Sequence, residues 1–262
     1  MPSLPFREAL QSGIAVALML CAVAAPVVIS VCWGWLPHYV AKGYASVKRF
    51  TPSATPRIKL PPGVKGTTVA PACMRFNLTR IRGELREYFN FVGCALFLLS
   101  SLYASVVMGQ PVEHRYFFLE LLLAGGRLKA FLRRYCAVLA GVSVMVLASA
   151  VTASLTPYLN YAYGTLAQAI AECCGFTALA MVAGASLGVM MSLLVRSVSG
   201  AFLASLGFVA VTLIASSVEG SGLASFVLPT FTIYGGGDPY TYLAVTVVVN
   251  VLSLIRVVRI EY

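Results

Sequence analysis

The sequence predicts an all-α membrane protein with six transmembrane helices and an enlarged first external loop. Of the 262 residues, 59% are hydrophobic and 11% are charged, and the mean hydropathy is +0.86. A soluble globular domain has about 25% charged residues, and a disordered chain holds too few apolar residues to match this composition. Both classes are therefore excluded, and the apolar residues also gather in long uncharged runs.

Six runs are long enough to cross a bilayer, which takes about 20 apolar residues in a helix. They are Gly13–Trp35, Phe91–Met108, Tyr135–Leu155, Cys173–Val195, Val198–Ser217 and Tyr240–Val258. The first run could instead be a secretory signal, because Arg7 precedes it and Ala22-Val23-Ala24 resembles a cleavage site. Its length favours an uncleaved helix, since the apolar region of a signal has about 7–15 residues.

The charges predict the orientation of these helices. The chain has 19 Lys and Arg against 9 Asp and Glu, a net charge of +10. With the N-terminus inside, the segments after the third and fifth spans, which lie outside, contain no Lys or Arg. Cytoplasmic loops usually carry the excess of Lys and Arg. We therefore expect a multi-pass protein of the cell membrane with both termini in the cytoplasm, and no nucleic-acid partner.

The first external loop, residues 36–88, is a separate insertion. Its many prolines predict an irregular start. Its surplus of Lys and Arg is not required by topology, so the loop either binds acidic lipid or surface polymer, or indicates that the first span is misplaced. Near its end, Leu78, Ile81, Leu85 and Tyr88 form one apolar stripe. This stripe predicts either an amphipathic helix on the membrane surface or a solvated extension of the second span.

Residues 111–134, between the second and third spans, have a pattern of their own. The second span is expected to end at Gln110-Pro111, and apolar residues then recur every three or four positions up to Ala124. Gly125-Gly126 ends this predicted helix, and basic residues follow up to Arg134. The segment is either a docking element for a cytoplasmic partner or an amphipathic connector at the headgroups.

The stretch from Glu113 to Arg134 resembles the first cytoplasmic loop of ABC-2-type transporter permeases. The family has a leading acid, a Leu-Glu pair, a leucine pair, an arginine in a turn and a basic residue before the third span. These are matched by Glu113, Leu119-Glu120, Leu121-Leu122, Arg127 and one of Arg133 and Arg134. Phe117 and Phe118 stand where the family has Gly and Thr, and Gly126 stands at the proline of the turn.

This resemblance implies a cytoplasmic coupling helix that meets an ABC ATPase (nucleotide-binding) subunit. The ATPase-coupling residues would be Glu113, Arg115, Glu120, Leu121, Gly126 and Arg127. The chain has no Gly-x-x-x-x-Gly-Lys-Ser/Thr phosphate loop, so the ATPase would be a separate chain. The resemblance also implies a dimer with a second permease copy or a paralogue, and export of a substrate that no residue identifies. The alternative is an accessory or scaffold subunit of another membrane complex, without ATP coupling.

No catalytic, cofactor or metal site is predicted. Gly184-Ala185-Ser186-Leu187-Gly188 matches the nucleophile motif of hydrolases, but it lies in the middle of a span, and the possible bases His38 and His114 fall in the first loop and the coupling segment, on opposite sides of the membrane in this topology. The cysteines lie mostly in or beside spans, and there is no Cys-x-x-Cys.

Three features of the later spans predict helix contacts or a transport path. Ala180, Gly184 and Gly188 are spaced to let two helices approach closely. Asn250 is expected to hydrogen-bond to a neighbouring helix. Glu172 adjoins the fourth span, so it is either a residue of the transport pathway or an interfacial side chain.

Overall fold

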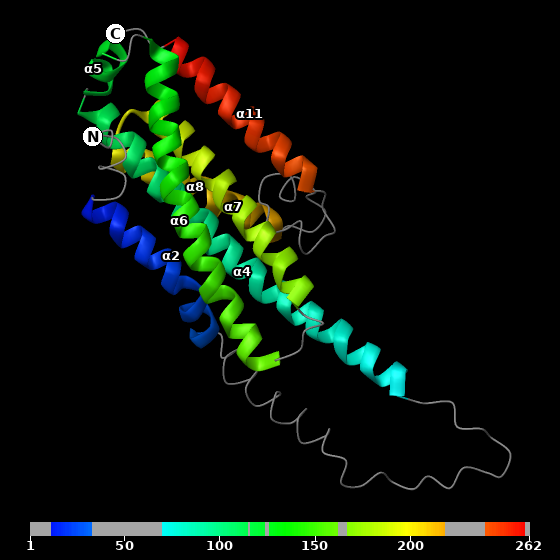
Figure 1. Cartoon of the computed structure of the whole chain (residues 1–262). Coiled ribbons are helices and arrows are strands. Elements are labelled where there is room, and N and C mark those ends of the chain that lie inside the picture. The colour runs from blue at the N-terminus through cyan, green and yellow to red at the C-terminus, as the bar shows by residue number, and fades with distance from the viewer. Residues whose placement is uncertain are drawn as a thin grey trace, which may run out of the picture.

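The computed structural model describes residues 12–32, 70–114, 116–123, 126–161, 167–217 and 239–259. The regular structure in these ranges is entirely helical (Figure 1). The helices are α2 (Gly13–Cys32), α4 (Ala70–Glu113), α5 (Tyr116–Leu123), α6 (Arg127–Tyr161), α7 (Ala167–Val195), α8 (Val198–Ser217) and α11 (Pro239–Val258). The predicted irregular part of the first loop and the segment 218–238 lie outside the described residues.

Four of these helices are long and apolar enough to cross a membrane. Their apolar stretches are Gly13–Ser30 in α2, Phe91–Glu113 in α4, Arg127–Leu155 in α6 and Cys173–Val195 in α7. Within the described residues, α8 and α11 contain shorter apolar stretches. The chain is therefore an α-helical, multi-pass membrane protein.

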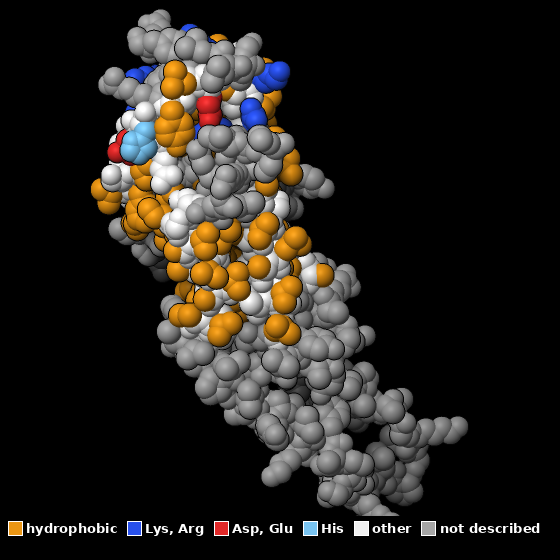
Figure 2. Space-filling model, turned by 60° about the vertical axis from the view of Figure 1, so that its left-hand side comes forward, with side chains coloured by type: hydrophobic (Ala, Val, Ile, Leu, Met, Phe, Trp, Pro, Cys, Tyr) orange, Lys and Arg blue, Asp and Glu red, His pale blue; other side chains and the backbone are white. Residues whose placement is uncertain are grey.

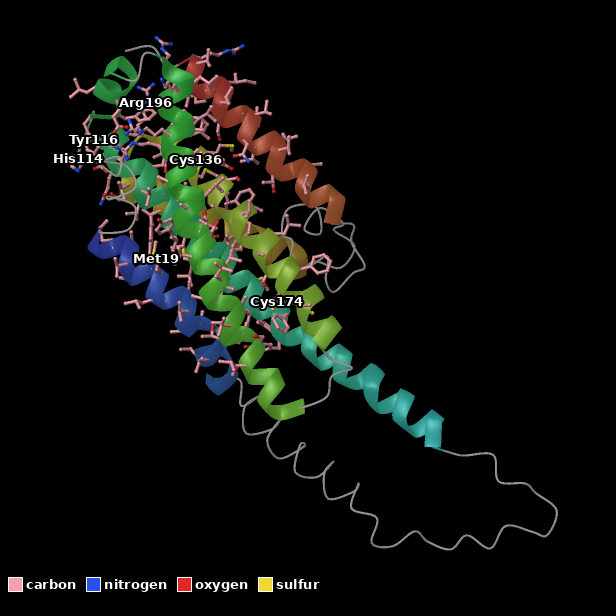
Figure 3. The ribbon with its side chains drawn as sticks, in the orientation of Figure 1. Met19, His114, Tyr116, Cys136, Cys174 and Arg196 are labelled. Carbon is pink, nitrogen blue, oxygen red and sulfur yellow. The ribbon has the colours of Figure 1, made fainter. Side chains whose placement is uncertain are left out.

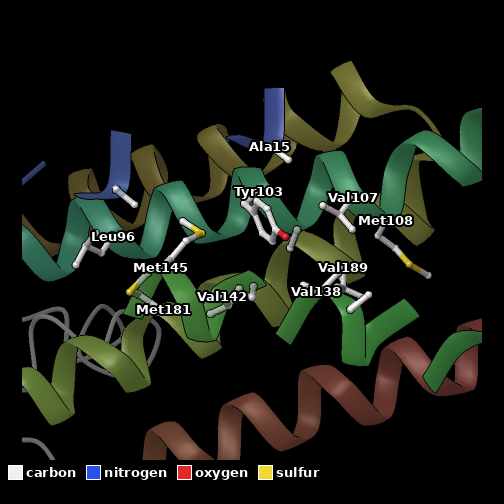
Figure 4. Packing of buried hydrophobic residues seen from close by; sticks show 14 of the residues in the cluster. Ala15, Leu96, Tyr103, Val107, Met108, Val138, Val142, Met145, Met181 and Val189 are labelled. Atoms are coloured by element: carbon white, nitrogen blue, oxygen red, sulfur yellow. The ribbon is translucent and has the colours of Figure 1, made fainter. Parts of the chain in front are cut away.

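Helix α4 lies at the centre of the bundle and contacts α2, α6, α7 and α8. Figure 4 shows Tyr103 and Val107 of α4 facing Val142 of α6 and Val189 of α7 in the buried cluster. The outer faces of the surrounding helices are also apolar: Leu147 is 71% exposed and Leu203 is 68% exposed. Large apolar side chains on the outer face are expected of helices that contact lipid, whereas helices in water usually place polar side chains there.

The backbones of α4 and α7 lie in direct contact. A Cβ atom at Gly184 would lie 2.3 Å from the carbonyl oxygen of Phe97, and one at Gly188 would lie 2.1 Å from that of Ser101. Ala180, one turn before Gly184, is buried on the same side of α7. The small residues at these positions therefore allow a helix approach that any larger side chain would block.

Buried serine side chains add hydrogen bonds to this contact. Ser192 Oγ donates to the carbonyl of Gly188 at 2.8 Å and lies 3.3 Å from the carbonyl of Ser105 on α4. Ser105 Oγ donates to the carbonyl of Ser101 at 2.9 Å and lies 3.4 Å from Ser205 Oγ on α8. These hydroxyl groups satisfy their hydrogen-bonding capacity on nearby carbonyls, so they can be buried at little cost.

Helix α4 is longer than predicted at both ends. It begins at Ala70, so the apolar stripe around Ile81 continues into the second span, and this favours the helical extension over a separate surface helix. Figure 1 shows this first part of α4, in cyan, extending beyond the other described helices. The predicted end at Gln110-Pro111 is wrong, because the helix continues to Glu113. Pro111 removes one backbone hydrogen bond, and burial of Pro111 and Val112 offsets that loss.

The third predicted span is also part of a longer helix. Helix α6 begins at Arg127, so the basic residues before Tyr135 belong to its first turns and not to a separate connector. A short helix is present before Gly126, as predicted, but it begins at Tyr116 and not directly after Pro111.

Replacing Gly188 by Ala should destabilise the protein, because the new methyl group would push against the backbone of α4. We expect a loss of about 1–3 kcal/mol, the usual cost of overpacking, measured as a lower melting temperature in detergent. Gly175→Ala is the matched control in the same helix, because a Cβ atom there meets nothing within 4 Å. Equal melting temperatures for the two variants would contradict the close contact.

Candidate functional site

The charged side chains that the structure describes gather at one end of the bundle (Figure 2). Here α4 ends, α6 begins, α7 turns into α8, and α11 ends. The residues are Glu113, His114, Glu120, Arg127, Lys129, Arg133, Arg134, Arg196, Arg256 and Arg259. We call this region the charged end. Figure 3 shows His114 after the end of α4, Tyr116 at the start of α5 and Arg196 between α7 and α8, all at this end.

An ion pair fixes the short helix α5 to α6. Arg134 Nε donates to Glu120 Oε2 at 2.6 Å, and Arg134 Nη2 donates to Glu120 Oε1 at 2.5 Å. The guanidinium carbon also lies 5.5 Å from the centre of the Tyr116 ring. Arg134 is only 1% exposed, and an unpaired charge in such a place would be costly. The two-point contact with Glu120 therefore allows the arginine to be buried.

Two further contacts hold helix ends together. Arg127 Nη1 donates to the carbonyl oxygen of Val258 at 2.7 Å, which ties the start of α6 to the last turn of α11. The backbone N–H of Val198 donates to Glu113 Oε2 at 2.8 Å, which ties the end of α4 to the start of α8. Both contacts match the helix dipole, because an acid meets an N-terminus and a base meets a C-terminus.

The corner between α7 and α8 is tight. Arg196 has a φ of 57°, the left-handed conformation, which turns the chain within one residue. Ser197 follows and caps α8, since its Oγ accepts a hydrogen bond from the N–H of Gly200 at 3.0 Å. The N-terminus of α8 is therefore positioned directly beside Glu113.

The structure brings several of the predicted coupling residues to the charged end but uses them inside the chain. The sequence pattern predicts that Glu113 opens a new helix, but in the structure Glu113 is the last residue of α4. Its carboxylate contacts α8. Glu120 contacts Arg134 of α6, and Arg127 contacts the carbonyl of Val258 in α11, so both also have partners within the chain. Gly126 precedes α6, with open space where a side chain would be. Arg115 and the side chain of Leu121 lie outside the described residues.

Two features of the charged end are missed by the sequence pattern. Arg134 is expected only as a basic anchor, whereas its side chain is buried against Glu120. Leu119 lies on the outer face of α5 and is 60% exposed, while Phe117 on the same helix is fully buried. The alternation of exposure along α5 follows from its packing on α6, which no local signal specifies.

Polar contacts inside the apolar part of the bundle centre on Ser186. Asn250 Nδ2 donates to Ser186 Oγ at 3.1 Å, which confirms the predicted link between α11 and another helix. The hydroxyl of Tyr135 lies 3.3 Å from the same oxygen, and Ser186 Oγ donates to the carbonyl of Val182. His114 is exposed at the charged end, so it cannot serve Ser186 as a base. Ser186 therefore joins three helices.

The other predicted site is only partly described. Glu172 lies in α7 just before its apolar stretch, and its side chain is outside the described part. His38 also falls outside it. Within the described ranges, no group of three His, Cys, Asp or Glu side chains is placed to hold a metal ion.

No protein-family model, curated protein or solved structure matches this chain. The class of multi-pass helical membrane protein therefore rests on the chain's own helices.

Replacing Arg134 by Gln should destabilise the protein by about 3 kcal/mol, because Glu120 would lose the partner of a largely buried pair. The measurement is the shift of the unfolding midpoint in denaturant. Arg133→Gln is the control, because Arg133 is exposed and forms no ion pair within the described residues. In a double-mutant cycle, Glu120→Gln should cost much less once Arg134 is already Gln. Equal losses for the Arg133 and Arg134 variants would refute a specific pair.

Proposed function

We propose that this chain is the permease subunit of an ABC-2-type transporter, which exports a substrate using ATP hydrolysed by a separate subunit. The observation that carries the proposal is α5, a short helix held at the charged end between two helices long enough to cross a membrane. A soluble ATPase can reach a helix in this position, outside the apolar part of the bundle. The sequence of α5 also carries the Leu-Glu and leucine pairs of the family's coupling helix.

The contacts of the charged end provide a route for force. A push on α5 would act on α6 through Glu120 and Arg134, and α6 is tied to α11 through Arg127. Transport would then proceed by rocking of helix groups about their shared interfaces. Glu172 is the proposed pathway residue, and a second permease copy or a paralogue would complete the transporter.

The proposed topology has six crossings. Helices α8 and α11 contain 20 residues each, so each is about 30 Å long and could span the hydrocarbon core. The surplus of Lys and Arg favours a cytoplasmic location for the charged end. Both termini would then lie in the cytoplasm of a cell-membrane protein, and residues 36–88 would lie outside.

Leu119 is the proposed contact point with the ATPase. It is a large apolar side chain, 60% exposed, in a helix surrounded by charged residues. Protein interfaces have an apolar core and a polar rim, so a partner that covers Leu119 would bury it at such a core. The open space at Gly126 lies at the other end of the same segment.

The second candidate is an accessory or scaffold subunit without ATP coupling. The intramolecular use of Glu113, Glu120 and Arg127 favours it, because these side chains already have partners within the chain. The two candidates differ in whether an ATPase binds α5.

Leu119→Glu should weaken assembly with the ATPase subunit, since a side chain that the complex would bury would become charged. Loss of a strong anchor costs at least about 2 kcal/mol, or roughly a thirtyfold weaker complex, measured by co-purification and ATP hydrolysis. Gly126→Trp should reduce both without unfolding the permease. Leu119→Met is the control and should keep both. Normal ATP hydrolysis in the Leu119→Glu and Gly126→Trp complexes, or the absence of any co-purifying ATPase, would favour the accessory subunit.

Cysteine labelling tests the topology. Cys73 lies in the first turn of α4 and Arg259 follows α11, so an impermeant maleimide should label Cys73 on intact cells. In a background without other cysteines, Arg259→Cys should react only after the cells are opened. The reverse pattern would overturn the proposed orientation.

A further inference from the structure

We infer that the last turn of α11 binds the headgroup of an anionic phospholipid, whose acyl chains lie along the exposed face of the same helix. Arg256 and Arg259 are the proposed headgroup ligands. This inference is independent of ATP coupling, because it depends only on the surface of α11 and the charges around it.

The charged end has a surplus of positive side chains that no described acid neutralises. Glu120 is paired with Arg134, and Glu113 accepts the N–H of Val198. No ion pair of Arg256 or Arg259 is formed with the residues that the structure describes. An anion at this place would therefore meet unneutralised charge.

Arg256 has a donor that is buried but unused. Its Nε atom is inaccessible and forms no hydrogen bond within the described part of the chain, while the residue as a whole is part-exposed. A buried donor of a charged group that forms no hydrogen bond is costly. Guanidinium groups bind phosphate through charge-assisted hydrogen bonds, so the part-exposed Arg256 can bind a phosphate at the surface without its inaccessible Nε atom.

The last carbonyl group of α11 is bound by Arg127 and by neither Arg256 nor Arg259, which leaves these two side chains available for an external ligand. The last carbonyl groups of a helix attract cations, and Arg127 Nη1 already donates to the carbonyl of Val258 at 2.7 Å. Arg259 is exposed, and its backbone N–H continues the helix by donating to the carbonyl of Ile255. The two arginines therefore lie at a helix end whose terminal carbonyl has another partner.

The outer face of α11 provides the apolar half of the site. Its large exposed side chains are Leu243, Val247, Val248, Val251, Leu252, Ile255 and Val258. Ile255 and Val258 flank Arg256 in sequence, so the apolar face reaches the two arginines without a polar gap. Apolar surface that ends in positive charge complements a phospholipid, whereas a soluble phosphate or a nucleic acid would leave the apolar surface uncovered.

The test compares two lipids on the purified full chain by native mass spectrometry. Phosphatidylglycerol and phosphatidylcholine with identical acyl chains are supplied in equal amounts, and phosphatidylglycerol should be retained preferentially. Each basic side chain near an anionic surface contributes about 1 kcal/mol, or roughly fivefold in binding. Arg256→Gln and Arg259→Gln should each reduce phosphatidylglycerol retention by about that factor and leave phosphatidylcholine unchanged.

Arg196→Gln is the matched control, because it removes the same charge from the same end of the bundle, at the α7–α8 corner. Equal retention of the two lipids would overturn the inference, and so would an equal loss in the Arg196 and Arg256 variants. Displacement of phosphatidylglycerol by inorganic phosphate at low millimolar concentration would show a soluble-anion site instead. If Arg256→Gln does not fold, Arg259→Gln carries the test, because Arg259 is exposed.

Discussion

The backbone contact between α4 and α7 is the constraint on which the rest of the bundle depends. In a bilayer, helices gain little from the hydrophobic effect when they associate, so close packing and hydrogen bonds hold them together. Gly184 and Gly188 remove the side chains that would separate the two backbones. Gly141 of α6 makes room for a side chain of α4, because a Cβ atom there would collide with the hydroxyl group of Tyr103. Glycines on α6 and α7 therefore allow α4 to pack closely against both helices.

This packing also determines the electrostatics of the charged end. Because α4, α6 and α7 are held in register, the helix ends beyond them meet in fixed pairs. Glu113 meets the positive end of α8, and Arg127 meets the negative end of α11. Arg134 can be buried because α5 brings Glu120 within hydrogen-bonding distance. Charges that would destabilise a membrane protein when isolated thus connect its helices.

Four of the six predicted membrane-crossing helices are present, because length and apolarity are local properties, whereas the described parts of α8 and α11 contain shorter apolar stretches. The bounds of α8 agree with the prediction, whereas the short helix before Gly126 begins later than predicted, at Tyr116. The end of α4 could not be predicted from local signals, because the burial of Pro111 and Val112 that offsets the lost hydrogen bond depends on the packing of the bundle. The family pattern selected Glu120 and Arg127, but not their partners. Arg134 is separated from Glu120 by a glycine break, so only the fold shows that they meet. Arg115 and the side chain of Glu172 lie outside the described residues, and their roles stay predictions.

The strength of the contacts differs across the bundle, and this difference bears on the proposed transport cycle. The α4–α7 contact is between backbones and leaves no space for sliding, so these helices would move together. In the apolar part, the described polar link between α11 and α7 is the bond of Asn250 to Ser186. Polar contacts between membrane helices contribute only about 0.6 kcal/mol on average, so this bond can be exchanged during a conformational change. Helix α11 is therefore better suited than α4 to change position, with Arg127 as its attachment at the charged end.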